Sequence, residues 1–197
     1  MEGKNPLKMK LPTSFYTRDN VVQIAKELLG KCLCTNFNGI LTAGMITETE
    51  AYKGIVDRAS HSFNNRFTQR TQVMYLEGGV AYVYLCYGIH SLFNVVTNIA
   101  GIPDAVLIRA IKPIDGLSEM LKRTSKTKIS ANFGIGPGNV CKILGVHYSH
   151  TGLNLSENKI WLEDRGLKIL DSEINVSPRI GVHYAGEDAK LPYRFCI

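Results

Sequence analysis

The chain has 197 residues, of which 45% are hydrophobic and 20% are charged. This composition excludes an intrinsically disordered chain and suits one domain of ordinary size. Lysine and arginine number 23 against 17 acidic residues, giving a formal net charge of +6 that weakly favours an acidic partner such as nucleic acid.

Residues 1–12 read as a flexible arm. Their sequence, MEGKNPLKMKLP, lacks the apolar run of a secretory signal, and no run in the chain reaches transmembrane length. We therefore expect a soluble, intracellular protein without membrane contact. A helix should follow, with Thr17 or Asp19 as its N-cap, apolar residues at helical spacing and an end at Gly30.

Two extended segments then flank Asn38-Gly39, a dipeptide that favours tight hairpin turns. The predicted strands are Cys32–Phe37 and Ile40–Tyr52. Regular alternation in the second strand would place four side chains on one face: Ile46, Glu48, Glu50 and Tyr52.

The segment Val80–Thr97 is rich in aromatic and β-branched residues, as strands are. A chain reversal near Gly88 would make it a second hairpin. Tyr87 would then lie at the tip, while Tyr82 and Tyr84 share an inner face.

The other predicted elements follow from local composition and spacing. They are a polar loop at Asp57–Thr71, a strand at Asp104–Ile111, a helix from Ile114, a basic linker at Lys122–Ser130, a short helix opened by Pro137, and strands at Ile160–Glu163, Gly166–Asp171 and Arg179–His183. Free backbone N–H groups near Pro137 suit an ordinary helix start or a phosphate site equally well. The order lacks regular βαβ alternation, so we expect an α+β fold with a curved, largely antiparallel sheet flanked by helices.

Cysteine and histidine spacing gives little reason to expect a metal. The five cysteines form no C-x-x-C pair, which is typical of reduced thiols. His147 and His150 are spaced H-x-x-H, but no carboxylate or cysteine cluster accompanies them. Neither a structural zinc site nor a metal-dependent nuclease is expected.

Tyrosines gather near glutamate and histidine in the strand-like segments. They are Tyr52, Tyr82, Tyr84 and Tyr87. Tyrosine is common in sheet cores, so ordinary packing explains such a group. The alternative is an aromatic slot that holds a flat, positively charged base by stacking and cation–π attraction.

Eight segments recur in an order that resembles the alkyladenine (3-methyladenine) DNA glycosylase family, from about Pro12 to the C-terminus. They are ITETEAY at 46–52, His61 with Ser62, RTQVMY at 70–75, AYVYLCYGIH at 81–90, FNVVT at 93–97, VLIRAIKP at 106–113, GPGNVC at 136–141 and RIGVHYAGEDAKLPYRF at 179–195.

The resemblance implies a compact mixed α/β fold, with residues 13–197 as a single glycosylase domain and a protruding β-hairpin for insertion into DNA. It implies a monofunctional enzyme that flips damaged purines of the 3-methyladenine, hypoxanthine and ethenoadenine class out of duplex DNA. The enzyme would hydrolyse the N-glycosidic bond and leave an abasic site, without a cofactor. A monomer is expected, cytoplasmic and nucleoid-associated in a bacterium or nuclear in a eukaryote.

The resemblance also implies roles for individual residues. Glu50 matches the catalytic glutamate that activates water, and Arg109 matches the arginine that helps hold this water and whose charge would lower the carboxylate pKa. Tyr52 and Tyr84 match the tyrosines that sandwich the flipped base, and His61 matches the histidine that closes the pocket.

Further matches concern specificity and DNA contact. Asn94 matches the asparagine that rejects the amino group of guanine, and Tyr87 matches the side chain that fills the gap left in the duplex. Arg66 and Arg70 are candidate phosphate ligands, although Thr68-Gln69-Arg70 replaces the Thr-Pro-Arg of many relatives, which would loosen this loop. The further phosphate candidates are Lys122, Arg123, Lys126 and Lys128.

Without the resemblance, plainer interpretations remain for the same residues. Glu50 with Arg109 would be a structural ion pair, with Glu48 pairing another arginine. His61 and Asn94 would be ordinary loop and strand-edge residues. A protein that binds damaged DNA without catalysis would share the basic charge and the aromatic slot, but it would not require Glu50 together with Arg109.

Overall fold

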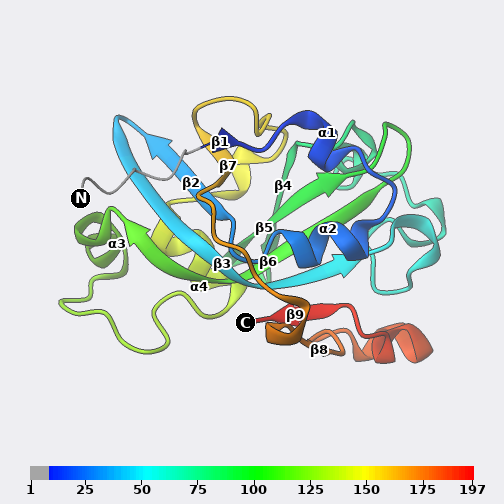
Figure 1. The fold of residues 1–197 in the computed structure, drawn as a ribbon. Coiled ribbons are helices and arrows are strands. Elements are labelled where there is room, and N and C mark those ends of the chain that lie inside the picture. Colours follow the sequence, from blue (N-terminus) through cyan, green and yellow to red (C-terminus); the bar gives the residue numbers. More distant parts are fainter. Residues whose placement is uncertain (1–8) are drawn as a thin grey trace.

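The computed structural model describes residues 9–197, in which an open, antiparallel sheet forms the centre of an α+β fold (Figure 1). The strand order is β1-β7-β2-β3-β6-β5-β4, and β8 and β9 join beside β3. The strands are β1 (Met9–Lys10), β2 (Cys32–Phe37), β3 (Ile40–Tyr52), β4 (Ala81–Cys86), β5 (His90–Thr97), β6 (Asp104–Asp115), β7 (Ile160–Asp164), β8 (Asn175–Ser177) and β9 (Arg194–Cys196). The predicted α+β class with a largely antiparallel sheet is thereby confirmed.

Helices pack on one face of the sheet and enclose the main core. They are α1 (Thr13–Tyr16), α2 (Val21–Glu27), α3 (Leu117–Thr124) and α4 (Pro137–Leu144). Helix α2 contacts β3 and β6, and α4 contacts β5 and β6. The core between them includes Ile24, Phe93, Ile108 and Leu144, all fully buried. No helix within residues 9–197 is both long and apolar enough to cross a membrane.

The structure has two helices where the sequence predicts one: α1 lies before the predicted cap, and α2 begins after it. Thr17 ends the short helix α1, and Asn20 rather than Thr17 or Asp19 caps α2. The Asn20 side chain accepts a hydrogen bond of 3.0 Å from the backbone N–H of Gln23, which supplies one of the partners that a helix start lacks. The predicted cap was therefore wrong by one to three residues.

A bulge in β3 decides which side chains face the site. The pairing of β3 with β6 shifts register between Ile46 and Glu48 and again between Glu48 and Thr49. Because one extra residue reverses the alternation, Ile46 joins the same core as Ala51. Glu48 and Glu50 therefore face away from that core, and the prediction that Ile46 shares their face was wrong.

The structure describes only the last residues of the predicted N-terminal arm, 9–12. Residues 1–8 lie outside the described part of the chain. Met9 and Lys10 pair with β7, and Lys10 donates to the carbonyls of Ser156 and Glu157 at 3.0 and 2.7 Å. Leu11 is buried in the core. Backbone pairing and these contacts fix the segment.

The basic linker also starts later than expected. Ile114 belongs to β6, and α3 runs to Thr124, so the helix takes up the first residues of the predicted linker. Arg123 turns inward and donates to the Ile143 carbonyl at 3.0 Å and to the Thr42 hydroxyl at 3.1 Å. Its predicted place in a solvated linker was therefore wrong.

Two segments that the sequence predicts as C-terminal strands do not form strands in the structure. Gly166 has a left-handed φ of +80°, and the predicted strand at Gly166–Asp171 is irregular. The predicted strand at Arg179–His183 is also irregular and ends in the 3₁₀ helix His183–Lys190. Strands form instead at β8 and β9, and β9 pairs with residues 48–50 of β3, beyond the stretch 40–45 that pairs with β2.

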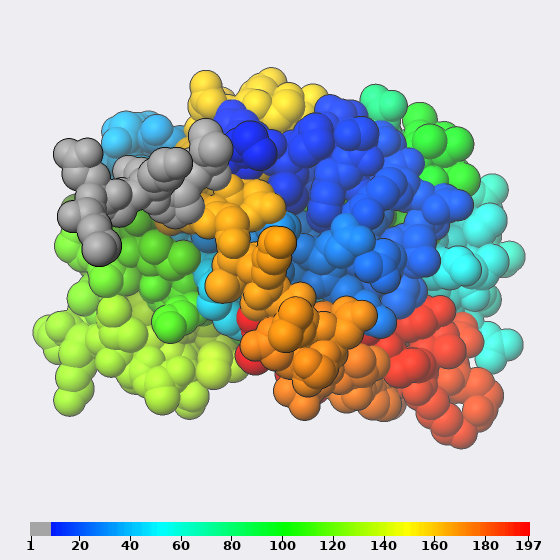
Figure 2. Space-filling model, in the orientation of Figure 1, coloured from blue at the N-terminus to red at the C-terminus, as the bar shows by residue number. Residues whose placement is uncertain are grey.

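Two irregular segments lie together beyond the end of β3. One contains the 3₁₀ helices Gly54–Val56, Phe63–Asn65 and Gln72–Tyr75, and the other is the C-terminal segment 178–193. The Arg58 N–H donates to Asp188 at 2.9 Å, and the Tyr184 hydroxyl donates to the Ala59 carbonyl at 3.2 Å. Figure 2 shows the C-terminal segment in red beside the cyan segment at one end of the molecule.

Candidate active site

A narrow pocket of about 40 Å³ opens between the sheet and these two irregular segments. Its lining residues are Tyr52, Ala59, Ser60, His61, Met74, Tyr82, Tyr84, Asn94, Ala105 and Tyr184. This volume suits a few water molecules and is too small for a purine. A base could therefore enter only if one wall moved outward.

Glu50 lies behind the Tyr52 wall of this pocket. Its carboxylate accepts a hydrogen bond of 2.8 Å from the Tyr52 hydroxyl and one of 2.7 Å from the backbone N–H of Ile180. The side chain has 0% exposure and is not among the residues that line the pocket. The Tyr52 side chain, which lines the pocket, therefore connects the pocket to Glu50 through its hydrogen bond. A water molecule in the pocket would have to pass the Tyr52 hydroxyl to contact the Glu50 carboxylate.

Glu50 belongs to a cluster of two buried carboxylates and two partly buried arginines. The Arg109 Nε lies 2.9 Å from Glu48 and 3.4 Å from Glu50, so its charge is shared. Arg194 donates to Glu48 at 2.6 Å. The expected pairing of Glu48 with an arginine is thereby confirmed.

Burial controls the ionisation of Glu50. Removal from water raises the pKa of the Glu50 carboxyl above its ordinary value, although the charge of Arg109 and the hydrogen bonds from Ile180 and Tyr52 act in the opposite direction. The prediction that Arg109 lowers this pKa gave the correct sign for its own contribution. The net direction is upward, because desolvation by burial is the larger effect.

His61 and two tyrosines form the opposite wall. His61 Nδ1 lies 2.8 Å from the Tyr82 hydroxyl, and its ring meets the Tyr84 ring edge-on with centroids 4.7 Å apart. Burial lowers the pKa of His61 to about 4, with smaller effects from nearby arginines. The imidazole is therefore neutral at pH 7.

Arg70 contacts this wall and lines a separate, wider groove. Its guanidinium lies 4.8 Å from the Tyr84 ring centroid, and its Nη2 lies 3.4 Å from His61 Nε2. The groove measures about 730 Å³ and shares Tyr82 and Tyr84 with the pocket. The two tyrosines therefore separate the pocket from the groove, and Arg70 lies on the groove side.

Three residues that the sequence did not single out support the Tyr52 wall. The side chains of Arg179 and Asp57 form a buried ion pair, with one N–H···O distance of 2.9 Å, and the Arg179 guanidinium lies 4.8 Å from the Tyr52 ring centroid. Ile180 supplies the N–H group that contacts Glu50. Segment 179–195 was recognised by its resemblance, but a separation of 130 residues gives no local pattern that would place Ile180 at Glu50.

The remaining candidates occupy two different environments. Asn94 is buried in the pocket lining, and its amide donates to the Tyr82 carbonyl at 3.1 Å. Tyr87 lies outside the pocket at the tip of the β4–β5 hairpin, where its side chain is 93% exposed and its φ is a left-handed +51°. Arg66 is exposed in the loop between β3 and β4. The structure thus gathers the other predicted residues around the pocket and leaves Tyr87, Arg66 and Arg70 on the surface.

Comparison with known proteins identifies the family of the chain. Residues 14–197 match the family described as methylpurine-DNA glycosylase. A protein of Chlamydia abortus (strain DSM 27085 / S26/3) is 46% identical over 188 residues, covering 95% of this chain and 97% of the relative. A protein of Bacillus cereus (strain AH187) is 43% identical over 195 residues, covering 95% of each chain.

A third relative, from Clostridium perfringens (strain 13 / Type A), is 39% identical over 197 residues and covers 96% of each chain. All three relatives are assigned as 3-methyladenine DNA glycosylases. The chain therefore belongs to the methylpurine-DNA glycosylase family and is a DNA N-glycosylase of base excision repair, a hydrolase that acts on DNA.

Proposed function

We propose that the enzyme flips a damaged purine out of duplex DNA and holds it between Tyr52 and the wall formed by His61 and Tyr84. The observation that supports this most is the hydrogen bond from Tyr52, a pocket residue, to the buried Glu50 beside Arg109. An aromatic slot with a carboxylate behind one wall suits a flat leaving group and a sugar that becomes cationic.

Glu50 acts as the general base. It takes a proton from water while the water oxygen forms a bond to C1′ of the sugar and the bond from C1′ to the purine nitrogen breaks. The electron pair of that bond leaves with the base. A purine alkylated at a ring nitrogen carries a positive charge, so it departs as a neutral molecule.

Asn94 restricts which purines fit the pocket. Its amide is held by the Tyr82 carbonyl in the buried lining, so the side chain occupies a fixed position. A purine with an additional exocyclic amino group would meet this amide. Rejection of guanine follows from that contact.

The lesion range extends from 3-methyladenine to hypoxanthine and ethenoadenine. Because His61 is neutral at pH 7, it does not serve as an acid for an uncharged leaving base. The chemical step should therefore be slower for hypoxanthine than for a cationic methylated purine.

Tyr87 fills the gap that the flipped nucleotide leaves in the duplex. Its exposure at a hairpin tip and its left-handed backbone suit a side chain presented outward. Arg66 and Arg70 lie in the neighbouring loop and bind backbone phosphates.

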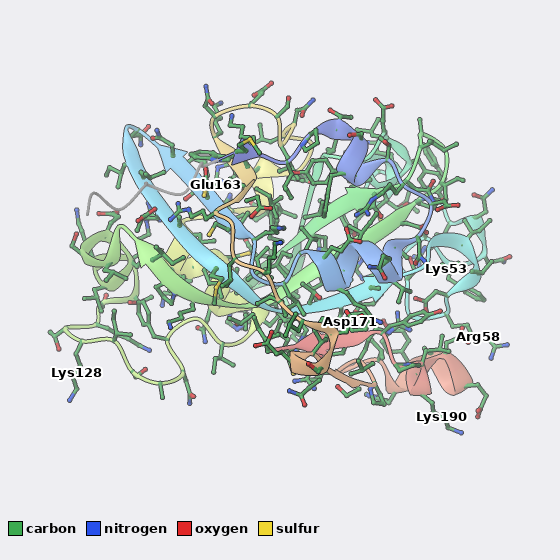
Figure 3. The ribbon with its side chains drawn as sticks, in the orientation of Figure 1. Lys53, Arg58, Lys128, Glu163, Asp171 and Lys190 are labelled. Carbon is green, nitrogen blue, oxygen red and sulfur yellow. The ribbon has the colours of Figure 1, made fainter. Side chains whose placement is uncertain are left out.

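Lys122, Lys126 and Lys128 are exposed, and α3, which carries Lys122, lies at the opposite end of the molecule from the C-terminal segment 178–193 (Figure 1). Lys128 projects from the opposite end of the molecule to Lys53, Arg58 and Lys190 in Figure 3. We therefore assign the phosphate contacts near the lesion to Arg66 and Arg70. The enzyme works as a monomer with one glycosylase domain, residues 13–197, and does not cleave the strand.

Glu50→Gln tests this function in a duplex that carries one hypoxanthine. The amide keeps the size of the side chain but cannot accept a proton, so base release should fall by about a hundredfold or more. Alkali then converts each abasic site into a strand break that is counted on a gel. Base release by Glu50→Gln at the wild-type rate would overturn the role of Glu50, and breaks without alkali would contradict the monofunctional mechanism.

A further inference from the structure

A buried ion pair supports the Tyr52 wall and has no part in the chemistry proposed above. The side chains of Arg179 and Asp57 are 0% and 2% exposed. Arg179 also donates to the Ala51 carbonyl at 2.9 Å and to the Asp188 carbonyl at 3.1 Å. Because removing two charges from water is costly, stability alone is a weak reason for such a pair.

The guanidinium contacts Tyr52 from outside the pocket. It lies 4.8 Å from the Tyr52 ring centroid and 5.4 Å from that of Tyr193. Tyr52 lines the pocket and Arg179 does not. A planar cation on one face of the ring limits its rotation and leaves the other face for a base.

The same arginine fixes the backbone on both sides of Glu50. Ala51, whose carbonyl accepts from Arg179, lies between Glu50 and Tyr52 in β3. Ile180, which follows Arg179, donates its N–H to the Glu50 carboxylate at 2.7 Å. Arg179 therefore connects strand β3, which carries Glu50, to the loop in which the Ile180 N–H group donates to the Glu50 carboxylate.

We propose that Arg179 is a positioning residue of the glycosylase reaction. Its fork and flat face hold the Tyr52 ring and the Ile180 N–H group against Glu50, while Asp57 neutralises its charge. This inference rests on the role of Glu50 as general base.

The opposite wall is supported differently. Arg70 also lies 4.8 Å from a tyrosine centroid, that of Tyr84, but it is exposed in a loop.

Arg179→Lys tests the proposal, because lysine keeps the charge beside Asp57 and loses the fork and the flat face. The assay follows release of 3-methyladenine from duplex DNA methylated with tritiated dimethyl sulfate. We expect kcat to fall about tenfold with KM changed by less than about threefold. The acid limb of kcat against pH should move to higher pH, because a loosened Ile180 N–H lowers the Glu50 pKa less.

Arg165→Lys is the matched control. Arg165 is 13% exposed and joins Glu163 and Asp115 at 2.7 Å each, beside β7 and away from the pocket. Both variants should unfold at lower temperature by circular dichroism, and Arg165→Lys should keep the wild-type kcat and pH profile. If Arg179→Lys does not fold, the double variant Asp57→Asn/Arg179→Gln replaces both charges with amides and carries the same expectation.

The outcomes separate this inference from the proposed function. A folded Arg179 variant with wild-type kcat and acid limb, or one that matches Arg165→Lys, would overturn the positioning role. If the Arg179 variant gives that result while Glu50→Gln is inactive in the same assay, the positioning role of Arg179 is wrong and the role of Glu50 stands. If Glu50→Gln is fully active, the proposed base and the inference fail together.

Discussion

The Tyr52 hydroxyl donates a hydrogen bond of 2.8 Å to the carboxylate of Glu50, two residues earlier on the same face of β3. Because a hydrogen bond to the ionised form favours ionisation, this phenol opposes the burial that raises the Glu50 pKa. It also connects the buried carboxylate to the pocket.

Tyr52→Phe should separate stacking from base positioning. The ring remains, so DNA affinity should stay near the wild-type value, but the donor to Glu50 is lost. We expect kcat to fall about tenfold and its acid limb to move to higher pH. Tyr148 is exposed in the neighbouring groove and donates no hydrogen bond to Glu50, so Tyr148→Phe should change neither value. An unchanged pH profile for Tyr52→Phe would contradict the coupling of this phenol to Glu50.

Ile180→Pro removes the backbone donor that contacts Glu50 at 2.7 Å. The pKa of Glu50 should rise further, because one hydrogen bond that stabilises the carboxylate is gone. The expected result is lower activity at pH 6 and partial recovery at pH 8, measured as single-turnover base release.

Ile180→Ala is the control, since it trims an exposed side chain and keeps the N–H group. It should retain the wild-type pH profile. Equal losses in the proline and alanine variants would mean that the side chain, and not the N–H group, supports Glu50.

Tyr87→Asn should impair base flipping without disturbing the hairpin. Asparagine tolerates the left-handed φ of +51° at this position but lacks a ring to fill the duplex. Base release from a paired lesion should fall about tenfold, with a smaller effect on the same lesion in single-stranded DNA, where little stacking is lost. Tyr87→Phe should restore the rate. A similar loss on both substrates would argue against a role in filling the gap.

Asp104 makes stability depend on pH. It is buried, accepts a hydrogen bond of 3.0 Å from Asn98, and burial raises its pKa from 3.8 to about 6. Because the pKa of Asp104 is higher in the folded than in the unfolded state, its protonated carboxyl contributes to the free energy of unfolding. This contribution is fully present below pH 3.8 and is lost as the pH rises through about 6.

Asp104→Asn should therefore raise the free energy of unfolding at pH 8 by up to roughly 3 kcal/mol, since each pKa unit corresponds to about 1.4 kcal/mol. Urea unfolding at pH 8 and at pH 4 would measure the difference, which should nearly vanish at the lower pH. Asp171→Asn, at an exposed position, should have little effect at either pH. A stabilisation that is equal at both pH values would exclude the titration of Asp104 as its cause.

The sequence by itself determined the elements that depend on neighbouring residues. Asn38-Gly39 fixed the first hairpin, because both residues adopt the left-handed backbone that such a turn requires. The parity of Tyr82 and Tyr84 against Tyr87 placed the first two beside the pocket and the third at an exposed tip. Motif order was enough to identify the family.

Only the tertiary structure decided how the Glu50 side chain is held. A bulge in β3 turns Glu48 and Glu50 away from the core that holds Ile46, and alternation alone cannot reveal an inserted residue. The burial that raises the Glu50 pKa, the N–H of Ile180 and the ion pair of Arg179 with Asp57 come from segments more than 100 residues apart. Such contacts depend on how the chain folds back on itself, because desolvation and hydrogen bonding are set by distance in space and not by distance along the sequence.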